Sequence, residues 1–456
     1  MVDLKTKIER LRTQSPTQPL ADDKAARLNR LKSELNQLVN RQRNRAGRAG
    51  DSARIDEASD DAPSTPVLHK QSSQGLSREL PGTSLDTPHG PLRHVRTQFP
   101  ASHRHGTVAI GGATEVDATL VAKVALDPVF ADLDFRRALF FDTETTGLAG
   151  GTGTLAFLIG LAWFENDQLQ IEQLLLTEPG QQEIAILMRV AERVALASCL
   201  VSYNGKSFDW PLLCTRFVLN RLALPQARPH LDLLHVARRA FKRRLTAVPL
   251  HRVEENVLGF IRQEDIDGAE IPARYFDFLH SGDGSLLAPV IDHNCHDVVA
   301  LAALLSAVVE AYASTADGQD ARDQISLAQV AMRAQDHTQA GVLAQKAADS
   351  DDDPDASAEA WVLLARLHRR RKQSALAIEA LTQGLSLVER DEEKAAYVHC
   401  LLAKIYEHDC KDYNAALAHA EKTAAVEGDQ GCANRVQRLR RLADQMERNA
   451  SGSKPK

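Results

Sequence analysis

The sequence predicts two folded regions of different class, a mixed α/β domain over residues 86–315 and an all-α repeat domain over residues 320–446. Two observations predict this division. Short apolar runs of strand length come first in the chain and long helical patterns follow them, which is typical of a mixed sheet packed by helices. Past residue 320 the sequence pattern changes to Ala-rich helical pairs. A length of 456 residues agrees with at least two hydrophobic cores.

The residues before the α/β domain divide into a basic helical segment, 1–45, and a linker, 46–85. Leu and Ile recur at helical spacing in the first segment, and residues 1–50 contain twelve Lys and Arg against five Asp and Glu. This charge suits either contacts with phosphates or a solvated helix face. The linker is rich in Ser, Asp, Gly and Pro, which predicts disorder, and residues 447–456 are predicted to be a disordered tail.

The composition restricts the compartment and the class of partner. The net charge is −6, so no basic field of the whole protein indicates nucleic acid. The six cysteines are scattered without a CxxC pair, which favours a reducing compartment and argues against structural zinc. No apolar stretch is expected to reach transmembrane length and the N-terminus does not resemble a secretory signal. We therefore expect a cytoplasmic protein with no membrane partner.

Within the α/β domain the expected elements follow one another in a simple order. An ordered lead-in begins at about Thr87, and Ser207 is a possible N-cap of the helix that follows the last strand. The predicted strands cover 137–144, 154–164, 169–176 and 199–203. The predicted helices cover about 116–130, 180–197, 208–222, 230–244, 249–259, 271–280 and 286–313.

Two carboxylates stand at the end of the first predicted strand, Asp142 and Glu144. Side chains at i and i+2 of a strand share one face, so the two charges repel each other unless a cation joins them. Hard oxygen ligands of this type suit Mg²⁺ or Mn²⁺. The alternative for an isolated pair is a solvated strand end followed by an ordinary turn.

A third carboxylate, Asp209, falls in the first turn of the helix after the last strand. The helix dipole favours an anion there, and capping alone could explain it. Asn204 and Lys206 in the preceding loop place polar and cationic groups near the same position. Phe208 and Trp210 could offer a stacking face, although we expect both to pack in the core.

The last motif combines a histidine and a carboxylate. His293 and Asp297 lie at i and i+4 of an apolar helix and therefore on one face. A histidine that titrates near neutrality beside a carboxylate suits a general base plus a metal ligand, and the alternative is a helix-surface contact. His296 is expected to point elsewhere.

A basic cluster lies between these motifs, and it suits phosphate contacts or a solvated helix face. Its members are Arg238, Arg239, Lys242, Arg243 and Arg244.

The helical pairs past residue 320 carry residues near the signature positions of tetratricopeptide repeats. One unit contains Trp361, Leu364, Ala365 and Gly384, and a similar unit follows it, but the spacing between units exceeds 34 residues. A plain helical bundle is the alternative. Stacked helix pairs form a concave face, so a protein or peptide partner is expected there.

The order of the acidic motifs resembles that of the DEDD 3′–5′ exonucleases of the ribonuclease H-like superfamily, and within it the YprB-like proteins with tetratricopeptide repeats. The resemblance covers about residues 78–312. It also rests on the segments 141–148 and 150–153, on Asp232-Leu233-Leu234-His235, and on Glu254, Leu258-Gly259, Asp265-Ile266-Asp267-Gly268 and His293-Asn294. Branches of the superfamily use Tyr-x-x-x-Asp or His-x-x-x-x-Asp in the last motif, whereas this chain has the histidine with the spacing of the tyrosine branch.

The resemblance implies a ribonuclease H-like α/β domain followed by tetratricopeptide-like repeats, and a 3′–5′ exonuclease acting on the 3′ end of DNA or RNA. It implies that two ions, Mg²⁺ or Mn²⁺, are held by Asp142, Glu144, Asp209 and Asp297, with His293 as a further catalytic residue. Nucleic-acid contacts are expected from Asn204, Lys206, Arg238, Arg239 and Arg243. Two alternatives stay open: a scaffold with little or no turnover, and a structure-specific endonuclease using the same site.

Overall fold

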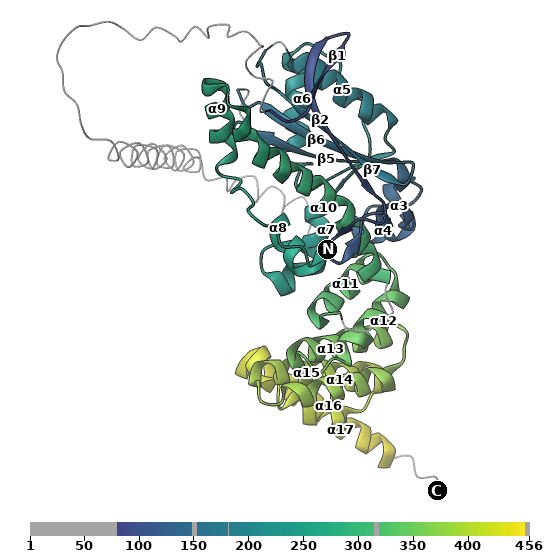
Figure 1. Ribbon diagram of the computed structural model, residues 1–456. Helices are drawn as coiled ribbons and strands as arrows, with labels where there is room; N and C mark the ends of the chain where they lie inside the picture. The colour runs from purple at the N-terminus through teal and green to yellow at the C-terminus, as the bar shows by residue number, and fades with distance from the viewer. Residues whose placement is uncertain (1–79, 148–152, 181, 314–318, 452–456) are drawn as a thin grey trace, which may run out of the picture. The chain divides into compact units, whose positions relative to one another are not determined.

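The computed structural model describes residues 80–147, 153–180, 182–313 and 319–451. The described residues belong to one compact unit in which a sheet with flanking helices precedes a series of helical pairs (Figure 1). The predicted basic segment 1–45, most of the predicted linker 46–85, and residues 148–152 of the glycine turn lie outside the described residues.

The described part of the α/β domain contains a seven-stranded sheet of mixed direction. Its order is β1-β2-β7-β6-β5-β8-β9. The neighbours β1-β2, β2-β7, β7-β6 and β6-β5 pair antiparallel, whereas β5-β8 and β8-β9 pair parallel. The bounds are β1 Thr83–Thr87, β2 Gly90–Pro100, β5 Ala138–Thr145, β6 Ala156–Glu165, β7 Gln168–Leu175, β8 Cys199–Ser202 and β9 His230–Asp232, and a separate hairpin joins β3 Arg104–His105 to β4 Val108–Ala109. The predicted mixed sheet is confirmed.

The β6–β7 hairpin shows why the central strands were predictable. Asn166 and Asp167 connect the strands with φ angles of 51° and 55°. Asn and Asp tolerate this left-handed conformation, which matches the twist of the flanking strands in a two-residue hairpin. The long apolar runs on both sides then set the register.

Helices cover both faces of the sheet. On β5, Phe140 belongs to a core shared with α4, α7 and the C-terminal part of α10, whereas Leu139 and Phe141 belong to a core shared with α5, α6 and α9. This alternation is the two-residue period of a strand buried on both faces. Figure 1 shows α10 crossing β5 and β6. The bounds are α3 Gly112–Glu115, α4 Ala118–Ala125, α5 Glu183–Leu196, α6 Asp209–Leu219, α7 Leu233–Leu245, α8 Leu250–Val253, α9 Ile271–Ser281 and α10 Ala288–Ala313.

Several sequence predictions about elements were wrong. Strands β1 and β2 lie in segments predicted as linker and lead-in, because polar residues such as Arg93, Arg96 and Gln98 interrupt the apolar positions of β2. β9 was missed since it has only three residues. Phe208, and not Ser207, is the N-cap of α6, and it makes no side-chain capping bond. The last helix continues to Ser451, into the predicted tail.

The C-terminal region is all-helical in its described residues, as predicted. Asp side chains cap most of these helices, for example Asp320, Asp353 and Asp412. A Cβ at Gly384 would lie 3.0 Å from the Cβ of Trp361, so the glycine allows α14 to approach α13 closely. The bounds are α11 Ala321–Arg333, α12 His337–Ala348, α13 Pro354–Arg370, α14 Ser374–Val388, α15 Glu392–Ile405, α16 Tyr413–Ala420 and α17 Ala424–Ser451.

The helical pairs pack directly on the α/β domain. The core on the α7 side of the sheet continues into α11 and α12. Arg244 Nε of α7 donates to Asp323 Oδ2 of α11 at 2.7 Å, and Lys123 Nζ of α4 donates to Asp336 Oδ2 at 2.8 Å. The two regions therefore share one hydrophobic core.

Among the described residues, one helix is long and apolar enough to cross a membrane by length and composition, over Gly284–Ala313. The expectation that no stretch reaches this length was therefore wrong. Of the most apolar window, 61% is buried inside the structure. The helix is apolar because α10 lies between the sheet and the surrounding helices.

Candidate metal centre

The site is built around the end of β5. Asp142 and Glu144 alternate along the strand with Thr143, so the two carboxylates lie on one face and the hydroxyl on the other. Burial, followed by the charges of Asp297, Glu144 and Asp209, raises the pKa of Asp142 well above its ordinary value. Burial and the charges of Asp297 and Asp209 raise the pKa of Glu144 to about 8.

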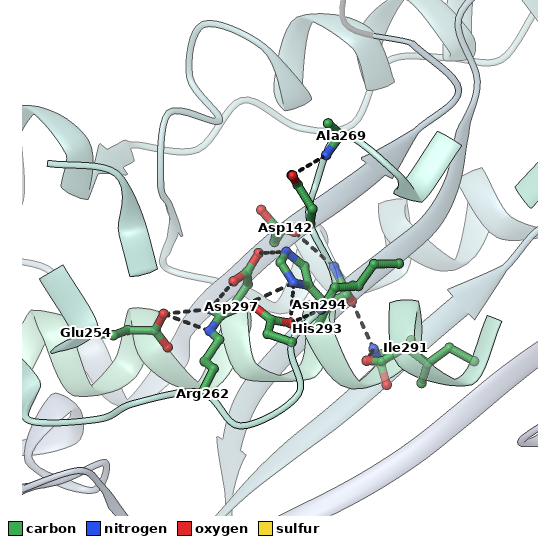
Figure 2. Close-up of polar contacts among 12 residues, drawn as sticks. Asp142, Glu254, Arg262, Ala269, Ile291, His293, Asn294 and Asp297 are labelled. Atoms are coloured by element: carbon green, nitrogen blue, oxygen red, sulfur yellow. Dashed lines mark hydrogen bonds and ion pairs between the residues drawn. The ribbon is translucent and has the colours of Figure 1, made fainter. Parts of the chain in front are cut away.

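Asp142 is oriented by an amide chain that connects β7 to α10. Asn294 Nδ2 donates to Asp142 Oδ2 at 3.0 Å (Figure 2). Gln173 Nε2 donates to Asn294 Oδ1 at 3.0 Å. Gly160 lies opposite Asp142 in the β5–β6 register. A Cβ at Gly160 would lie 2.3 Å from Asn294 Oδ1, so only glycine leaves room for this amide.

Asp209, in the first turn of α6, lies beside β5 and acts electrostatically on Asp142 and Glu144. The Thr143 hydroxyl donates to Asp209 Oδ1. Burial raises the pKa of Asp209 to about 6, although the hydrogen bond from Thr143 opposes the shift. A Cβ at Gly205 would lie 3.1 Å from Asp209 Oδ2, so the loop before α6 passes close to this carboxylate.

That loop is fixed by the buried side chain of Asp232 at the end of β9. The backbone N–H of Asn204 donates to Asp232 Oδ1 at 2.8 Å, and the N–H of Lys206 donates to Oδ2 at 3.2 Å. Asp232 Oδ1 also accepts from the N–H of Leu234 at 3.1 Å and caps α7. One carboxylate thus ties the loop beside Asp209 to the start of α7.

His293 and Asp297 lie one turn apart on α10, with 3.6 Å between His293 Nε2 and Asp297 Oδ2. His293 Nδ1 is 2.7 Å from Asp265 Oδ1. In the tautomer with its proton on Nδ1 the ring donates to Asp265, which only accepts, and Nε2 is the acceptor. Arg262 Nη1, which only donates, lies 3.3 Å from the same Nδ1. Ligand atoms of Glu144, His293 and Asp297 all lie within 4.8 Å of one another.

Arg262 is the residue that sequence reasoning missed. Its guanidinium donates from Nη2 to Asp297 Oδ1 and from Nε to Glu254 Oε2 at 2.9 Å (Figure 2). Nη1 donates to Asp265 Oδ2 at 3.2 Å. Burial disfavours its charge, but the charges of Asp297 and Glu254 outweigh burial and raise the pKa of Arg262. A single arginine in a polar loop carries no sequence signal for such a role.

A second layer supports Arg262. Glu254 is buried and 0% exposed, and its Oε1 lies 2.8 Å from His105 Nε2. The ring of His105 stacks on Phe260 at 3.8 Å between centroids. Glu254 and Asp265 carried the family resemblance without an assigned role, and the structure shows both as partners of Arg262.

The donor set fits divalent cations. All four predicted carboxylates contribute to one electrostatic cluster, in which burial and mutual repulsion raise the pKa of three of them. Within the described part of the chain, Arg262 is the cation that pairs with a member of this cluster. Oxygen ligands in such a number suit Mg²⁺ or Mn²⁺.

Of the residues predicted to contact nucleic acid, Arg238, Arg239 and Arg243 are spread along α7. Asn204 and Lys206 lie in the loop before α6 that Asp232 holds. Arg239 Nη2 donates to the carbonyls of Val124 and Ala125 at 3.1 and 3.0 Å, and Arg243 Nη2 donates to Glu359 Oε1 at 3.0 Å, whereas Arg238 is exposed. Phe208 was expected to pack in the core, but its side chain is 61% exposed beside Asp209.

Comparison with known proteins agrees with this geometry. The sequence profile of the RNase_H superfamily matches residues 139–309, which include all five predicted catalytic residues. The chain is also 33% identical over 333 residues to the protein YprB of Bacillus subtilis (strain 168), an alignment that covers 72% of this chain and 78% of YprB.

Proposed function

The chain belongs to the same family as YprB of Bacillus subtilis and contains a ribonuclease H-like domain, and on this premise we propose that it is a metal-dependent nuclease that removes nucleotides from the 3′ end of DNA or RNA. The proposal is carried by Glu144, His293 and Asp297, whose ligand atoms lie within 4.8 Å of one another, together with the electrostatic coupling of these carboxylates to Asp142 and Asp209. The raised pKa of Asp142, Glu144 and Asp209 means that their ionised forms are disfavoured without a cation.

Asp142, Glu144, Asp209 and Asp297 would hold the ions. Bound divalent ions supply a more acidic water and stabilise negative charge at the leaving oxygen of a phosphodiester. The protein orients the ligands: Asn294 fixes Asp142, Thr143 fixes Asp209 and Arg262 fixes Asp297. Such supporting bonds restrict each carboxylate to one direction.

His293 has the features of a general base in this proposal. Asp265 holds the imidazole through Nδ1 and leaves Nε2 directed toward the cluster, 3.6 Å from Asp297 Oδ2. Nε2 can then accept the proton of an attacking water. His293 stands four residues before Asp297, as the tyrosine does in the Tyr-x-x-x-Asp branch, and it therefore reaches the carboxylates from the same helix face as Asp297.

Substrate direction rests on the motif order of the exonucleases that the chain resembles. The exposed ring of Phe208 beside Asp209 supports a nucleic-acid substrate, because an aromatic face next to the carboxylates can stack on a terminal base.

A nuclease assay tests the proposal. Strands of DNA and RNA labelled at either end are incubated with Mg²⁺, Mn²⁺ or EDTA. A 5′-labelled strand should shorten progressively with either metal and stay intact in EDTA. Asp142→Asn should lower the rate about 100-fold or more, because it removes a metal ligand directly.

Asp86→Asn is the matched control, since Asp86 is an exposed carboxylate on the edge strand β1. It should cleave at the rate of the natural protein. Near-normal cleavage by Asp142→Asn would refute the site, and cutting of a closed circular strand would identify an endonuclease instead.

A further inference from the structure

A groove runs between α7 and the helical pairs. It consists of two adjoining hollows of about 1310 and 500 Å³ that share Arg243, Gln329 and Arg333. Together they are lined by ten Lys and Arg but only five Asp and Glu. In a chain with a net charge of −6, this is a local concentration of positive charge.

The acidic side chains of the groove are largely neutralised by neighbours. Glu359 pairs with Arg243, Asp355 lies 2.7 Å from Lys394, and Asp353 lies 3.7 Å from Arg322. Three exposed cations, by contrast, pair with no carboxylate of the described residues: Lys242 of α7, Arg333 of α11 and Arg370 of α13. These three side chains are available to an anionic ligand.

The groove is connected to the metal centre by α7. Asp232, which holds the loop beside Asp209, also caps this helix, and Lys242 near its other end lines the groove. Between them the exposed side chains His235 and Arg238 continue the same face. Since α7 has thirteen residues, it spans about 20 Å at 1.5 Å per residue.

The walls of the groove also offer an aromatic face. Tyr397 lines it and is 39% exposed, and its hydroxyl accepts from Arg366 Nη2 at 2.5 Å. A positively charged groove with an exposed aromatic ring is typical of surfaces that bind single strands.

We propose that this groove binds the single-stranded part of the nucleic acid whose 3′ end occupies the metal centre. The inference rests on the proposed nuclease function and names the path of its substrate. A strand leaving the centre would follow His235, Arg238 and Lys242 along α7, then meet Arg333 and Arg370. Continuity with the centre favours a nucleic acid over an acidic peptide. At the 3.4 Å rise of a stacked strand, about six nucleotides cover the length of α7.

Binding of labelled strands, measured by fluorescence anisotropy, tests the path. The full chain carries Asp142→Asn to suppress cleavage, and Mg²⁺ is present. The triple variant Lys242→Gln, Arg333→Gln, Arg370→Gln is compared with Lys411→Gln, Lys422→Gln, Arg441→Gln, a matched set of exposed cations outside the groove. Thermal midpoints of both triple variants confirm that they fold.

For a strand of about twenty nucleotides, the logarithm of the association constant should decrease linearly with the logarithm of the salt concentration. The magnitude of this slope should be about 2 smaller in the groove variant, since each of the three lost phosphate contacts of a single strand contributes about 0.7. The control variant should keep its slope. For strands of about three nucleotides or fewer, the two variants should bind equally, because such strands end on α7 before they reach Lys242.

Equal slopes for both variants on the long strand would overturn the proposal, as would an equal loss for short and long strands. Loss of binding to poly-glutamate in the groove variant, with strand binding intact, would assign the groove to an acidic protein segment instead. If the natural chain cleaves strands but both triple variants show the same salt dependence, the proposed binding groove is refuted and the proposed nuclease function is not. If binding depends on the groove but the natural chain cleaves no strand, the proposed nuclease function is refuted and the binding groove is not.

Discussion

At the scale of single residues, the site contains a cation that belongs to the protein itself. Arg262 is 6% exposed at its side chain and contacts Asp297, Glu254 and Asp265. Asp297 is therefore held by an arginine on one oxygen, while the other faces His293. The planar guanidinium suits this role because it donates in several fixed directions at once.

Replacing Arg262 should show how far the stability of the protein depends on these contacts. Arg262→Met keeps much of the apolar stem but leaves Glu254 buried without its guanidinium partner, so the metal-free protein should lose about 3–5 kcal/mol of unfolding free energy. Arg262→Lys should recover only part of it, because an ammonium cannot contact all three carboxylates in the same way. Urea unfolding in EDTA measures both.

Arg274→Met is the control for this experiment, since Arg274 forms an exposed i,i+4 pair with Glu270 at 3.5 Å on α9. It should change stability by less than about 1 kcal/mol. A similarly small loss for Arg262→Met would mean that Glu254 and Asp297 do not depend on the guanidinium.

The sequence predicted residues that have their own local signal, and it missed those defined by contacts. Asp142 and Glu144 follow an apolar run, and Asp297 lies one turn after His293, so their spacing alone was informative. Thr143 lies between the first two of these carboxylates, but neither its bond to Asp209 nor the contacts of Arg262 have a local sequence signal. Their roles arise because segments from distant parts of the chain meet, which no local pattern records.

At the scale of elements, the position of α10 on the sheet depends on one missing side chain. Gly160 of β6 faces Asn294 of α10, and a Cβ there would lie 2.3 Å from Asn294 Oδ1. Asn294 in turn bonds Asp142. Helix α10, which carries His293 and Asp297, can thus pack closely on β6 because residue 160 is a glycine.

Gly160→Ala should therefore act as an active-site mutation without touching a ligand. Displacing Asn294 should cost about 1–3 kcal/mol of stability by overpacking. It should also lower cleavage, since Asp142 loses its oriented amide. Gly341→Ala is the opposite case, because a Cβ at Gly341 of α12 meets nothing within 4 Å. This change should add about 0.5–1 kcal/mol through helix propensity.

Denaturation midpoints of the two variants, measured side by side, check the prediction. Equal stabilities would show that α10 shifts freely to accommodate the new methyl group. The same comparison explains which elements were predictable: β6 and β7 have long apolar runs and a turn of Asn and Asp, whereas β9 is short and β2 is half polar.

At the scale of the whole molecule, the carboxylate cluster couples folding to pH, and the proposed metal binding would couple it to ions as well. The folded-state pKa of Glu144 is about 8 and that of Asp209 is about 6, both above their ordinary values. The folded protein then binds more protons than the unfolded chain in this range. The stability contributed by these protonated groups is present at low pH and is lost as the pH rises through the folded-state values.

In EDTA, the unfolding free energy should therefore decrease as the pH rises from about 6 to about 8. Glu144→Gln should flatten this dependence. Excess Mg²⁺ should reverse its sign, because the ions bind the deprotonated carboxylates and stabilise only the folded state. Thermal or urea unfolding across the pH range measures all three curves, and an unchanged slope in Mg²⁺ would contradict metal binding at the cluster.

The hydrogen bond between Asn294 and Asp142 joins residues 152 positions apart in the sequence. Contacts of such long range form late in folding, because a long loop must close before they are made. A ribosome that has released β5 to β9 has therefore not yet supplied the helix that completes the cluster. The nascent chain can hold a nearly finished sheet and still lack the complete carboxylate cluster, which is assembled in one step, close to the end of synthesis of the α/β domain.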